Sequence, residues 1–479
     1  MKVNYFSLFG LVALLGSGCT VGPNYHRPAV NAPAQWSSPL SGGETNSSMI
    51  NAAWWKTFHD PELDSLITRA VLSNLNLRVA EARMREARAQ RTVIAADFWP
   101  SADVTGSYTR NRLSKHGFLA SQFPPGTPLD YDLYEADFDA SWEIDVFGGT
   151  RRAAEAANAE IAAAEFNRRD VLVSLLAEVA RNYIEARGFQ QRLAIAGQNA
   201  ETQKEALDIT RDRYKHGLNS DLDVQQASAL LSATEGQIPT LEILLKASTH
   251  RLGVLLGQPP GALLAELSSE APVPELPPEV PVDLPADLLR RRPDVQRAER
   301  ELAAATARIG VAVADLFPKF SLTGVAGLQS VSASDWLTGS SRLWTAGPTM
   351  QWRIFDAGRI RANVRVQNAR QQQALANYEQ TVLNSFEDVE NALVAYAKEQ
   401  VRFRLLEATV KADREAVAMA SDLYQNGLAD FLRVLDAERS LYQAEDELAQ
   451  SGRAMSLNLV ALYKALGGGW QTGGHGATT

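Results

Sequence analysis

The residue types that usually carry chemistry are sparse in this chain and do not form a site. The six histidines are scattered, with no metal-ligand spacing among them, and a single cysteine, Cys19, excludes an intramolecular disulfide and a cysteine-based zinc site. The sequence contains no glycine-rich phosphate loop and no nucleophile elbow. We therefore expect no catalytic residue, no metal and no cofactor. The one group expected to undergo covalent chemistry is the Cys19 thiol.

Cys19 lies where a bacterial lipoprotein would be processed. Residues 1–18 read as a secretory signal, with an apolar run too short for a finished membrane helix and small residues, Gly16–Gly18, directly before the cysteine. This arrangement resembles a lipobox, whose cysteine takes a diacylglycerol, although Gly16 stands where that motif prefers Leu. Because Thr20 is not the Asp that retains such lipoproteins in the inner membrane, the resemblance implies outer-membrane sorting. An ordinary signal peptide with an incidental cysteine is the alternative.

A fourteen-residue motif occurs twice, beginning at Tyr214 and at Tyr424, and the other elements are arranged around it. Six of its fourteen positions are identical, where chance would give about one. Each copy lies between long segments with helical spacing that are rich in Ala, Leu, Glu, Gln and Arg. The glycine of each copy, Gly217 or Gly427, suits the left-handed residue that ends a helix, and a Ser or Asp three residues later can cap the next helix. Each copy is therefore predicted to be the tip of a long helical hairpin.

Long helices are predicted on both sides of each tip and at the start of each repeat. Their boundaries follow from the helical periodicity, from capping residues and from the positions of Pro and Gly. In the first repeat a very long helix should lead up to the tip and a shorter one should return from it. The predicted helices are Pro61 to Asp97, Gly149 to Lys215, Ser220 to about Leu256 and Leu288 to Asp315.

Two strands are predicted between the helices of each repeat. The clearest, Tyr134–Val146, alternates strictly, with Phe138 and Trp142 on one face and Asp137 and Asp139 on the other. Thirteen such residues are enough to cross a bilayer as a tilted strand, although a half-buried strand of a soluble sandwich is the alternative. Four strands cannot close a barrel, and open sheet edges cannot exist in lipid, so the strands must be pooled between chains. The sequence therefore predicts an oligomer.

The whole chain is thus predicted to be two repeats of one mixed α and β pattern. Eight extra residues in the first repeat fall in a Pro-rich surface connection around 113–130. The predicted divisions are a signal peptide, 1–18; an extended N-terminal segment, 19–57; repeat 1, 58–257, with strands 100–112 and 134–147; a Pro-rich linker, 258–285; repeat 2, 286–467, with strands 319–330 and 343–355; and a Gly-rich tail, 468–479.

Several motifs together resemble one family. The Val-Gly-Pro-x-Tyr run at 21–25, the Trp-Trp…Phe-x-Asp-Pro-x-Leu run at 54–63 and the duplicated tip resemble TolC-like outer-membrane efflux proteins. They look most like the lipoprotein branch that serves resistance-nodulation-division (RND) pumps, and the resemblance runs from Cys19 to about Gly467. It implies a homotrimer in which four strands per chain form a transmembrane β-barrel that is continued by a long α-helical barrel.

The same resemblance implies a passive function. The trimer would be the lipid-anchored exit duct of a tripartite efflux system, located in the cell outer membrane and extending into the periplasm. An inner-membrane RND pump would drive small molecules, such as drugs or other toxic compounds, through a periplasmic adaptor (a membrane fusion protein) into the duct. The net charge of −9 and the lack of a Lys/Arg block argue against nucleic acid as a partner. A pore-free coiled-coil scaffold lipoprotein is the main alternative, and an enzyme is a more distant one.

The resemblance also implies a gate at the tips. Leu432 and Asp436 lie four residues apart, so they share one helix face, and they match family positions that ring the closed entrance. Asp223 matches a family aspartate that pairs with the second-tip tyrosine, here Tyr424. Ser220-x-x-Asp223 equally reads as a capping box, so both roles of Asp223 stay open. The tip residues expected to contact the adaptor are Gly217, Leu218, Gly427 and Leu428.

Overall fold

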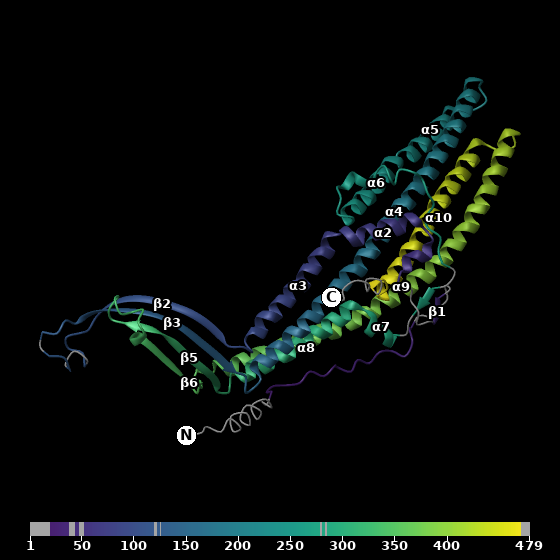
Figure 1. Cartoon of the computed structure of the whole chain (residues 1–479). Helices are drawn as coiled ribbons and strands as arrows, with labels where there is room; N and C mark the ends of the chain where they lie inside the picture. The colour runs from purple at the N-terminus through teal and green to yellow at the C-terminus, as the bar shows by residue number, and fades with distance from the viewer. Residues whose placement is uncertain are drawn as a thin grey trace. The chain divides into compact units, whose positions relative to one another are not determined.

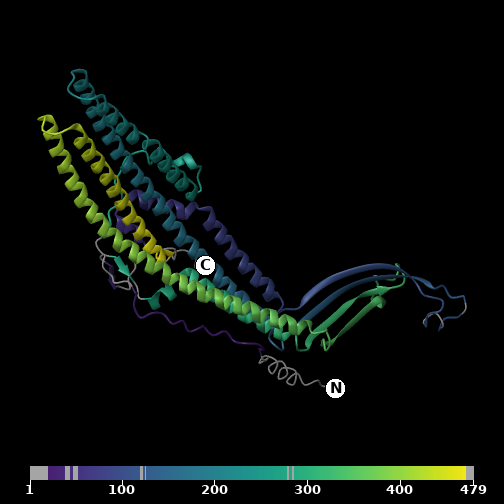
Figure 2. The same cartoon turned by 180° about the vertical axis from the view of Figure 1, so that it is seen from behind.

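The computed structural model of the chain describes residues 20–37, 44–46, 52–118, 122–124, 126–277, 280–282 and 285–470. Cys19, the expected lipid attachment site, lies outside these residues. Within them, no helix is both long enough and apolar enough to cross a membrane. Figures 1 and 2 show the helices and strands from opposite sides.

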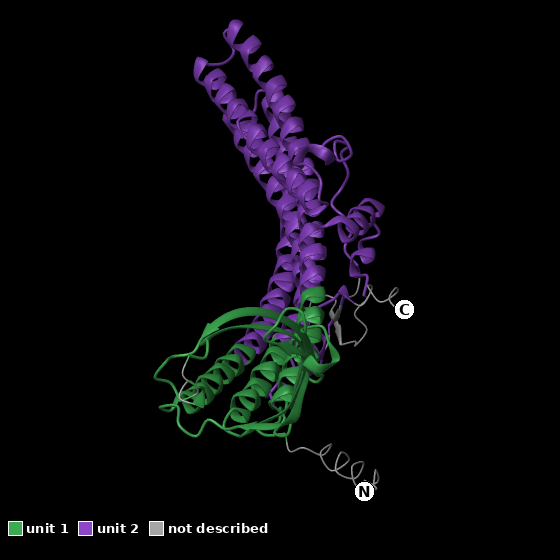
Figure 3. Ribbon diagram, turned by 60° about the vertical axis from the view of Figure 1, so that its left-hand side comes forward, with its two compact units in different colours: residues 1–28, 84–164, 298–378 green, residues 29–83, 165–297, 379–479 purple. Residues whose placement is uncertain are grey.

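The contacts within the chain define two compact units (Figure 3). Unit 1 holds the four-stranded sheet, and unit 2 holds both helical tips. Each unit takes a part of both sequence repeats, so the compact units do not coincide with the repeats. Unit 1 comprises residues 1–28, 84–164 and 298–378, and unit 2 comprises residues 29–83, 165–297 and 379–479.

One antiparallel sheet forms the strand part of unit 1 (Figure 1). The strands pair in the order β2-β3-β5-β6. The central pairing joins β3 of the first repeat to β5 of the second, so both repeats share one sheet. Within this described sheet, β2 and β6 each have one neighbouring strand and one open edge. The bounds are β2 Ser101–Arg112, β3 Asp130–Ile144, β5 Lys319–Ser330 and β6 Arg342–Gln351.

The strand predicted over 134–147 is shifted toward the N-terminus in the structure. It begins at Asp130, which pairs in register with Arg112 at the end of β2. Asp130 and Asp132 also form exposed ion pairs with β2, at 3.5 Å to Arg112 and 4.0 Å to Arg110. It ends at Ile144, because the next residue, Asp145, accepts hydrogen bonds from the first backbone amides of the following helix. The strand predicted over 343–355 likewise ends early, at Gln351.

Side chains alternate between the two faces of the sheet as the sequence predicts. One row of register partners across all four strands is apolar, and the adjacent row carries Asp103 opposite Asp139. The apolar side chains are well exposed in the single chain, with Phe138 at 66% and Trp344 at 80%. The apolar row consists of Val104, Phe138, Ala326 and Trp344.

Two equivalent tryptophans tie the sheet to the helices that precede it. The indole nitrogen of Trp142 donates to the Phe98 carbonyl at 3.0 Å, and that of Trp352 donates to the Leu316 carbonyl at 3.1 Å. Each acceptor lies just after the end of a helix, where carbonyl groups lack helical partners. Both repeats therefore fix the turn before their first strand in the same way.

Three predicted helices are broken in the structure. The helix expected from Pro61 to Asp97 divides at Asn74 into α2 (Pro61–Ser73) and α3 (Leu75–Ala96). The Asn74 side chain accepts a hydrogen bond from the Leu77 backbone amide at 3.0 Å, so it caps α3. It also donates a hydrogen bond to the Leu255 carbonyl at 2.8 Å, which joins this break to a helix much later in the chain. Asp60 caps α2, because its side chain accepts hydrogen bonds from the Glu62 and Leu63 amides.

The other two breaks involve proline. The helix expected over 288–315 is α7 (Pro285–Arg291) and α8 (Pro293–Ala314), since Pro293 cannot donate the amide hydrogen that would continue α7. The return helix expected from Ser220 to about Leu256 is α5 (Asp221–Glu235) and α6 (Ile238–Leu255). Its break follows Gly236, and a proline lies in the first turn of α6.

The helix that leads to the first tip has the predicted bounds, and the helix that leads to the second tip has the same length. They are α4 (Gly149–Lys215) and α9 (Arg359–Gln425), each of 67 residues, and α10 (Phe431–Ala465) returns from the second tip. The main core of unit 2 includes Trp54, which stacks on Tyr463 at 5.2 Å between ring centroids. The short elements are β1 (Glu44–Asn46), which pairs in parallel with β4 (Val280–Val282), and the 3-10 helices η1 (Trp54–Phe58), η3 (Pro260–Leu263) and η4 (Gly339–Ser341).

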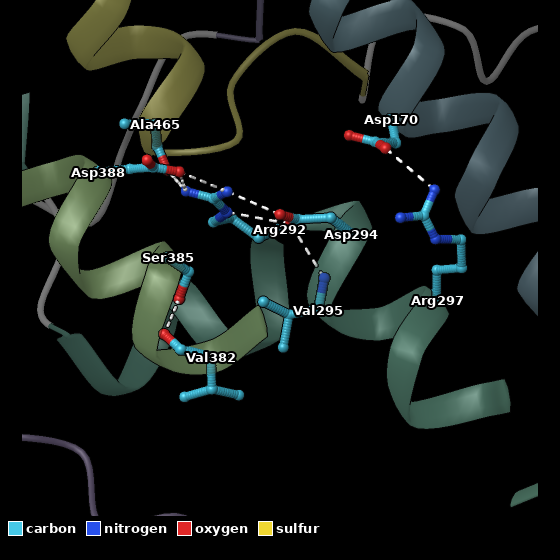
Figure 4. A network of polar contacts seen from close by, with 9 residues as sticks. All are labelled: Asp170, Arg292, Asp294, Val295, Arg297, Val382, Ser385, Asp388 and Ala465. Atoms are coloured by element: carbon cyan, nitrogen blue, oxygen red, sulfur yellow. Dashed lines mark hydrogen bonds and ion pairs between the residues drawn. The ribbon is translucent and has the colours of Figure 1, made fainter. Parts of the chain in front are cut away.

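A buried polar network in unit 2 joins the start of α8 to α9 and to the end of α10 (Figure 4). Arg292 donates to both carboxylate oxygens of Asp294, at 3.0 and 2.6 Å, and also to Asp388 at 2.9 Å and the Ala465 carbonyl at 3.1 Å. Its side chain is 11% exposed. Nearby, Arg297 pairs with Asp170 of α4 at 3.3 Å. One arginine thus ties three helices of the second repeat together, and the Arg297–Asp170 pair joins that repeat to α4 of the first.

Candidate functional site

The two tips have the same backbone geometry. Gly217 and Gly427 have φ of +73° and +74°, a conformation that glycine adopts without strain. The following amides, of Leu218 and Leu428, bond back to the Arg213 and Leu423 carbonyls at 2.9 and 2.8 Å. This six-to-one bond is the helix-ending pattern that the glycine spacing predicts. Each long helix therefore ends at its tip, and its partner helix starts within a few residues.

The two return helices are capped by the residues that the sequence indicates. The Ser220 hydroxyl accepts from the Asp223 amide, and an Asp223 carboxylate oxygen accepts from the Ser220 amide at 3.0 Å. That reciprocal pair is a capping box. In the second tip the Asp430 side chain accepts from the Arg433 amide. Asp223 is thus committed to the start of α5 within the chain.

Tyr424 lies in a contact that differs from the expected one. Its hydroxyl accepts a hydrogen bond from the side-chain Nδ2 of Asn219 at 2.9 Å, and the predicted Tyr424–Asp223 pair is not formed in the chain. The ring is buried, packs against Phe431 with centroids 5.1 Å apart, and has the Arg213 guanidinium 4.4 Å from its centre. Asn219 therefore links the first tip to the last turn of the helix that leads to the second.

The tip core explains why the tyrosines of the two motifs have different environments. Tyr424 is 8% exposed, whereas its counterpart Tyr214 is 46% exposed. Asn219 and Arg213 were missed by the sequence reasoning. The available signal was the mismatch between Asn219 and its counterpart in the second motif, Ala429, because one copy offers a donor and the other does not. The buried residues of this tip core are Leu207, Val224, Ala227, Leu230, Tyr424, Phe431, Val434 and Leu435.

The other predicted tip residues point away from this core. Leu432 is 45% exposed and lies on one face of α10 with Asp436, whose carboxylate is 3.8 Å from Arg439. Leu218 and Leu428 are among the most exposed leucines of the described chain, at 68% and 76%. An exposed apolar side chain at each tip suits contact with another protein. The gate and adaptor roles of these residues remain predictions.

One carboxyl group below the tips has an unusual environment. Glu438 of α10 has a buried carboxylate oxygen without a hydrogen-bond partner in the described part of the chain. Burial raises the pKa of Glu438 to about 7. Ionisation of this group therefore opposes the close packing of α10 as the pH rises past neutrality.

Nothing in the described ranges resembles a metal centre. Among residues 20–37, 44–46, 52–118, 122–124, 126–277, 280–282 and 285–470, no group of three or more His, Cys, Asp or Glu side chains is placed to hold a metal ion. What the arrangement offers instead is a sheet with one apolar and one polar face, together with two helical tips that carry exposed leucines.

Comparisons with known proteins agree with this arrangement. A family model described as "Outer membrane efflux protein" matches residues 66–258 and 284–468. Nodulation protein T of Rhizobium leguminosarum bv. trifolii is 31% identical over 467 residues, covering 96% of each chain. The pyoverdine export outer membrane protein OpmQ of Pseudomonas aeruginosa is 32% identical over 477 residues, covering 99% of each chain.

The fold is also that of a solved outer-membrane channel. The structure of the channel OprN superposes with a TM-score of 0.88 at 39% sequence identity, covering 95% of this chain and 100% of OprN. This likeness confirms the expected fold class of paired strands and long helices in two repeats. The match in sequence, extent and fold shows that the chain belongs to the outer membrane efflux protein family and is an outer-membrane channel component of an efflux system.

Proposed function

We propose that three copies of the chain together form one lipid-anchored channel, through which small molecules leave the cell passively. The observation that carries this proposal is the sheet of unit 1, which is apolar on one face, polar on the other and open at both edge strands. Open edges cannot face lipid, so β6 of one copy must pair with β2 of the next. Three copies of four strands, the number that the family resemblance implies, give a barrel of twelve.

The chain itself supplies no energy for transport in this proposal. An inner-membrane RND pump would drive the exported compound, and a periplasmic adaptor would contact the exposed leucines of the two tips, Leu218 and Leu428. Adaptor binding needs only a higher affinity for the open arrangement of the tips to shift the population toward it. The name of OpmQ describes pyoverdine export by that relative, which makes small secreted organic molecules a reasonable class to test here.

Four measurements test the proposal against a pore-free scaffold lipoprotein. Purified full-length protein should migrate as a trimer in detergent, resist dissociation by SDS and conduct ions in a planar bilayer. Co-purification from the native envelope should recover an inner-membrane pump with its adaptor. A monomer without conductance would favour the scaffold and contradict the channel.

Acylation of Cys19 is the first residue-level prediction. Residues directly after it are fixed to unit 1 by their own contacts: the Val21 amide donates to the Phe147 carbonyl at 3.1 Å, and Arg152 donates to the Val21 carbonyl and to Asn24. Cys19→Ala should therefore preserve the fold and weaken only membrane retention, measured by fractionation. An intact mass of the mature protein without a lipid on residue 19 would refute acylation.

A second prediction concerns the link between the tips. Tyr424→Phe combined with Asn219→Ala removes the hydrogen bond that joins them, so the tips should separate more readily. We expect a higher single-channel conductance in a planar bilayer without the adaptor present. Asp223→Ala is the matched control, because it removes one half of the capping box at the start of α5 without touching the Tyr424 link. Parent-like conductance of a double variant that is still trimeric would show that this link does not hold the gate.

A further inference from the structure

Three acidic side chains share one face of β3, the strand between β2 and β5 in Figure 1. Glu135, Asp137 and Asp139 alternate with apolar residues, and Asp103 of β2 lies opposite Asp139 in the register. We name these four residues the acidic stripe. Its members lie on the face opposite Phe138, so in the proposed channel they line the interior of the strand region.

Asp137 is the unusual member of the acidic stripe. It is only 7% exposed, and its Oδ1 atom is buried without a hydrogen-bond partner in the described part of the chain. Its register partner on β5 is Gly327. A Cβ atom at position 327 would overlap the Asp137 carboxylate, so the glycine provides the space that this side chain occupies.

The surroundings of the acidic stripe do not neutralise it. Asp139 accepts a hydrogen bond from the Thr105 hydroxyl at 2.9 Å, and Glu135 accepts one from the Gln329 amide at 3.1 Å. Both donors are uncharged. Elsewhere on β3, Asp130, Asp132 and Glu143 form ion pairs with Arg112, Arg110 and Lys319, whereas within the described residues Glu135, Asp137 and Asp139 form none.

A buried carboxylate without a partner is costly, and neighbouring carboxylates increase the cost. A mobile cation can offset both, because carboxylate oxygens are the preferred ligands of hard cations. We propose that the acidic stripe binds small inorganic cations and makes the strand region of the channel cation-selective. This inference rests on the proposed channel function.

The test is the reversal potential of the purified full-length protein in a planar bilayer under a KCl gradient. The parent should prefer K⁺ over Cl⁻, and added Ca²⁺ should reduce its K⁺ current. Asp137→Asn with Asp139→Asn should lower the K⁺/Cl⁻ permeability ratio at least about twofold and relieve the Ca²⁺ effect, since acidic rings set cation preference in pores. Asp436→Ala, made in parallel, measures the separate contribution of the tips.

The matched control is Asp130→Asn with Asp132→Asn, which removes two charges from the same strand at positions that alternate with the acidic stripe. This control should leave the permeability ratio near that of the parent. An unchanged ratio in the stripe variant, or an equal fall in the control, would overturn the inference. If the stripe variant does not assemble, Glu135→Gln carries the same test. Absence of any conductance from the assembled parent would instead contradict the proposed channel.

Discussion

Phe138→Arg is expected to prevent assembly of the channel in the outer membrane. Phe138 is 66% exposed in the single chain, and its register partners on β2 and β5 are Val104 and Ala326. This row therefore forms the lipid-facing surface of the proposed barrel. An arginine facing lipid near the middle of a bilayer costs about 2–4 kcal/mol in each copy, and a trimer carries the substitution three times.

Asp139→Arg is the matched control for Phe138→Arg, because it introduces the same side chain one residue away on the opposite face. The measurement is the amount of SDS-resistant trimer in the outer-membrane fraction. We expect a near-complete loss for Phe138→Arg and a much smaller one for Asp139→Arg, which would change ion preference instead. Equal losses would mean that the faces of β3 have been assigned the wrong way round.

Arg292→Met should cause the largest loss of stability outside the membrane. Arg292 is buried and is the shared donor to Asp294, Asp388 and the end of α10 (Figure 4). Methionine preserves much of the side-chain volume but leaves the Asp294 charge without its partner, and breaking a buried pair in this way costs about 3–5 kcal/mol. Thermal unfolding followed by circular dichroism should show a clearly lower midpoint. Arg297→Met, which breaks a more exposed pair, should lower it less.

The pH dependence of stability gives an independent check on this pair. Burial acts to raise the pKa of Asp294, but the hydrogen bonds and charge of Arg292 outweigh burial and hold that pKa below its usual value. The carboxylate therefore contributes stability above the ordinary carboxyl pKa of about 4, and the contribution is lost as the pH falls through the lowered value. The parent should lose this increment on acidification, and Arg292→Met should lack it at every pH. An equal acid-dependent loss in both proteins would contradict the assigned role of Asp294.

The sequence predicts those features that depend on neighbours along the chain. Gly217 and Gly427 mark the tips because a left-handed residue is needed there, and the alternation around Phe138 identifies a strand. Pro293 is a local signal of the same kind, since proline cannot continue a helix, but the predicted helix over 288–315 overlooked it. These signals lie within a few residues of the feature that they specify.

Features that depend on distant partners could not be read in this way. Asn74 ends α2 and caps α3 while donating to Leu255, which is 181 residues away. The hydrogen bond from Asn219 to Tyr424 spans 205 residues. Alternation shows which face of a strand is apolar but not which strand pairs with it. The order β2-β3-β5-β6, and the position of Asp137 over Gly327, therefore required the fold.

The pairing of β3 with β5 has a consequence for how such a channel arises. β2 and β3 form one hairpin, β5 and β6 form another, and the junction between them is antiparallel, as the junction between neighbouring copies would also be. The trimer is then a ring of six similar hairpins in which every second junction is covalently tethered. A tether replaces an encounter between separate molecules with an intramolecular one at high effective concentration. Fusion of two ancestral half-length chains would thus have reduced an assembly of six chains to an assembly of three. Each half could still diverge in sequence, and the counterparts Asn219 and Ala429 at the tips show such a difference.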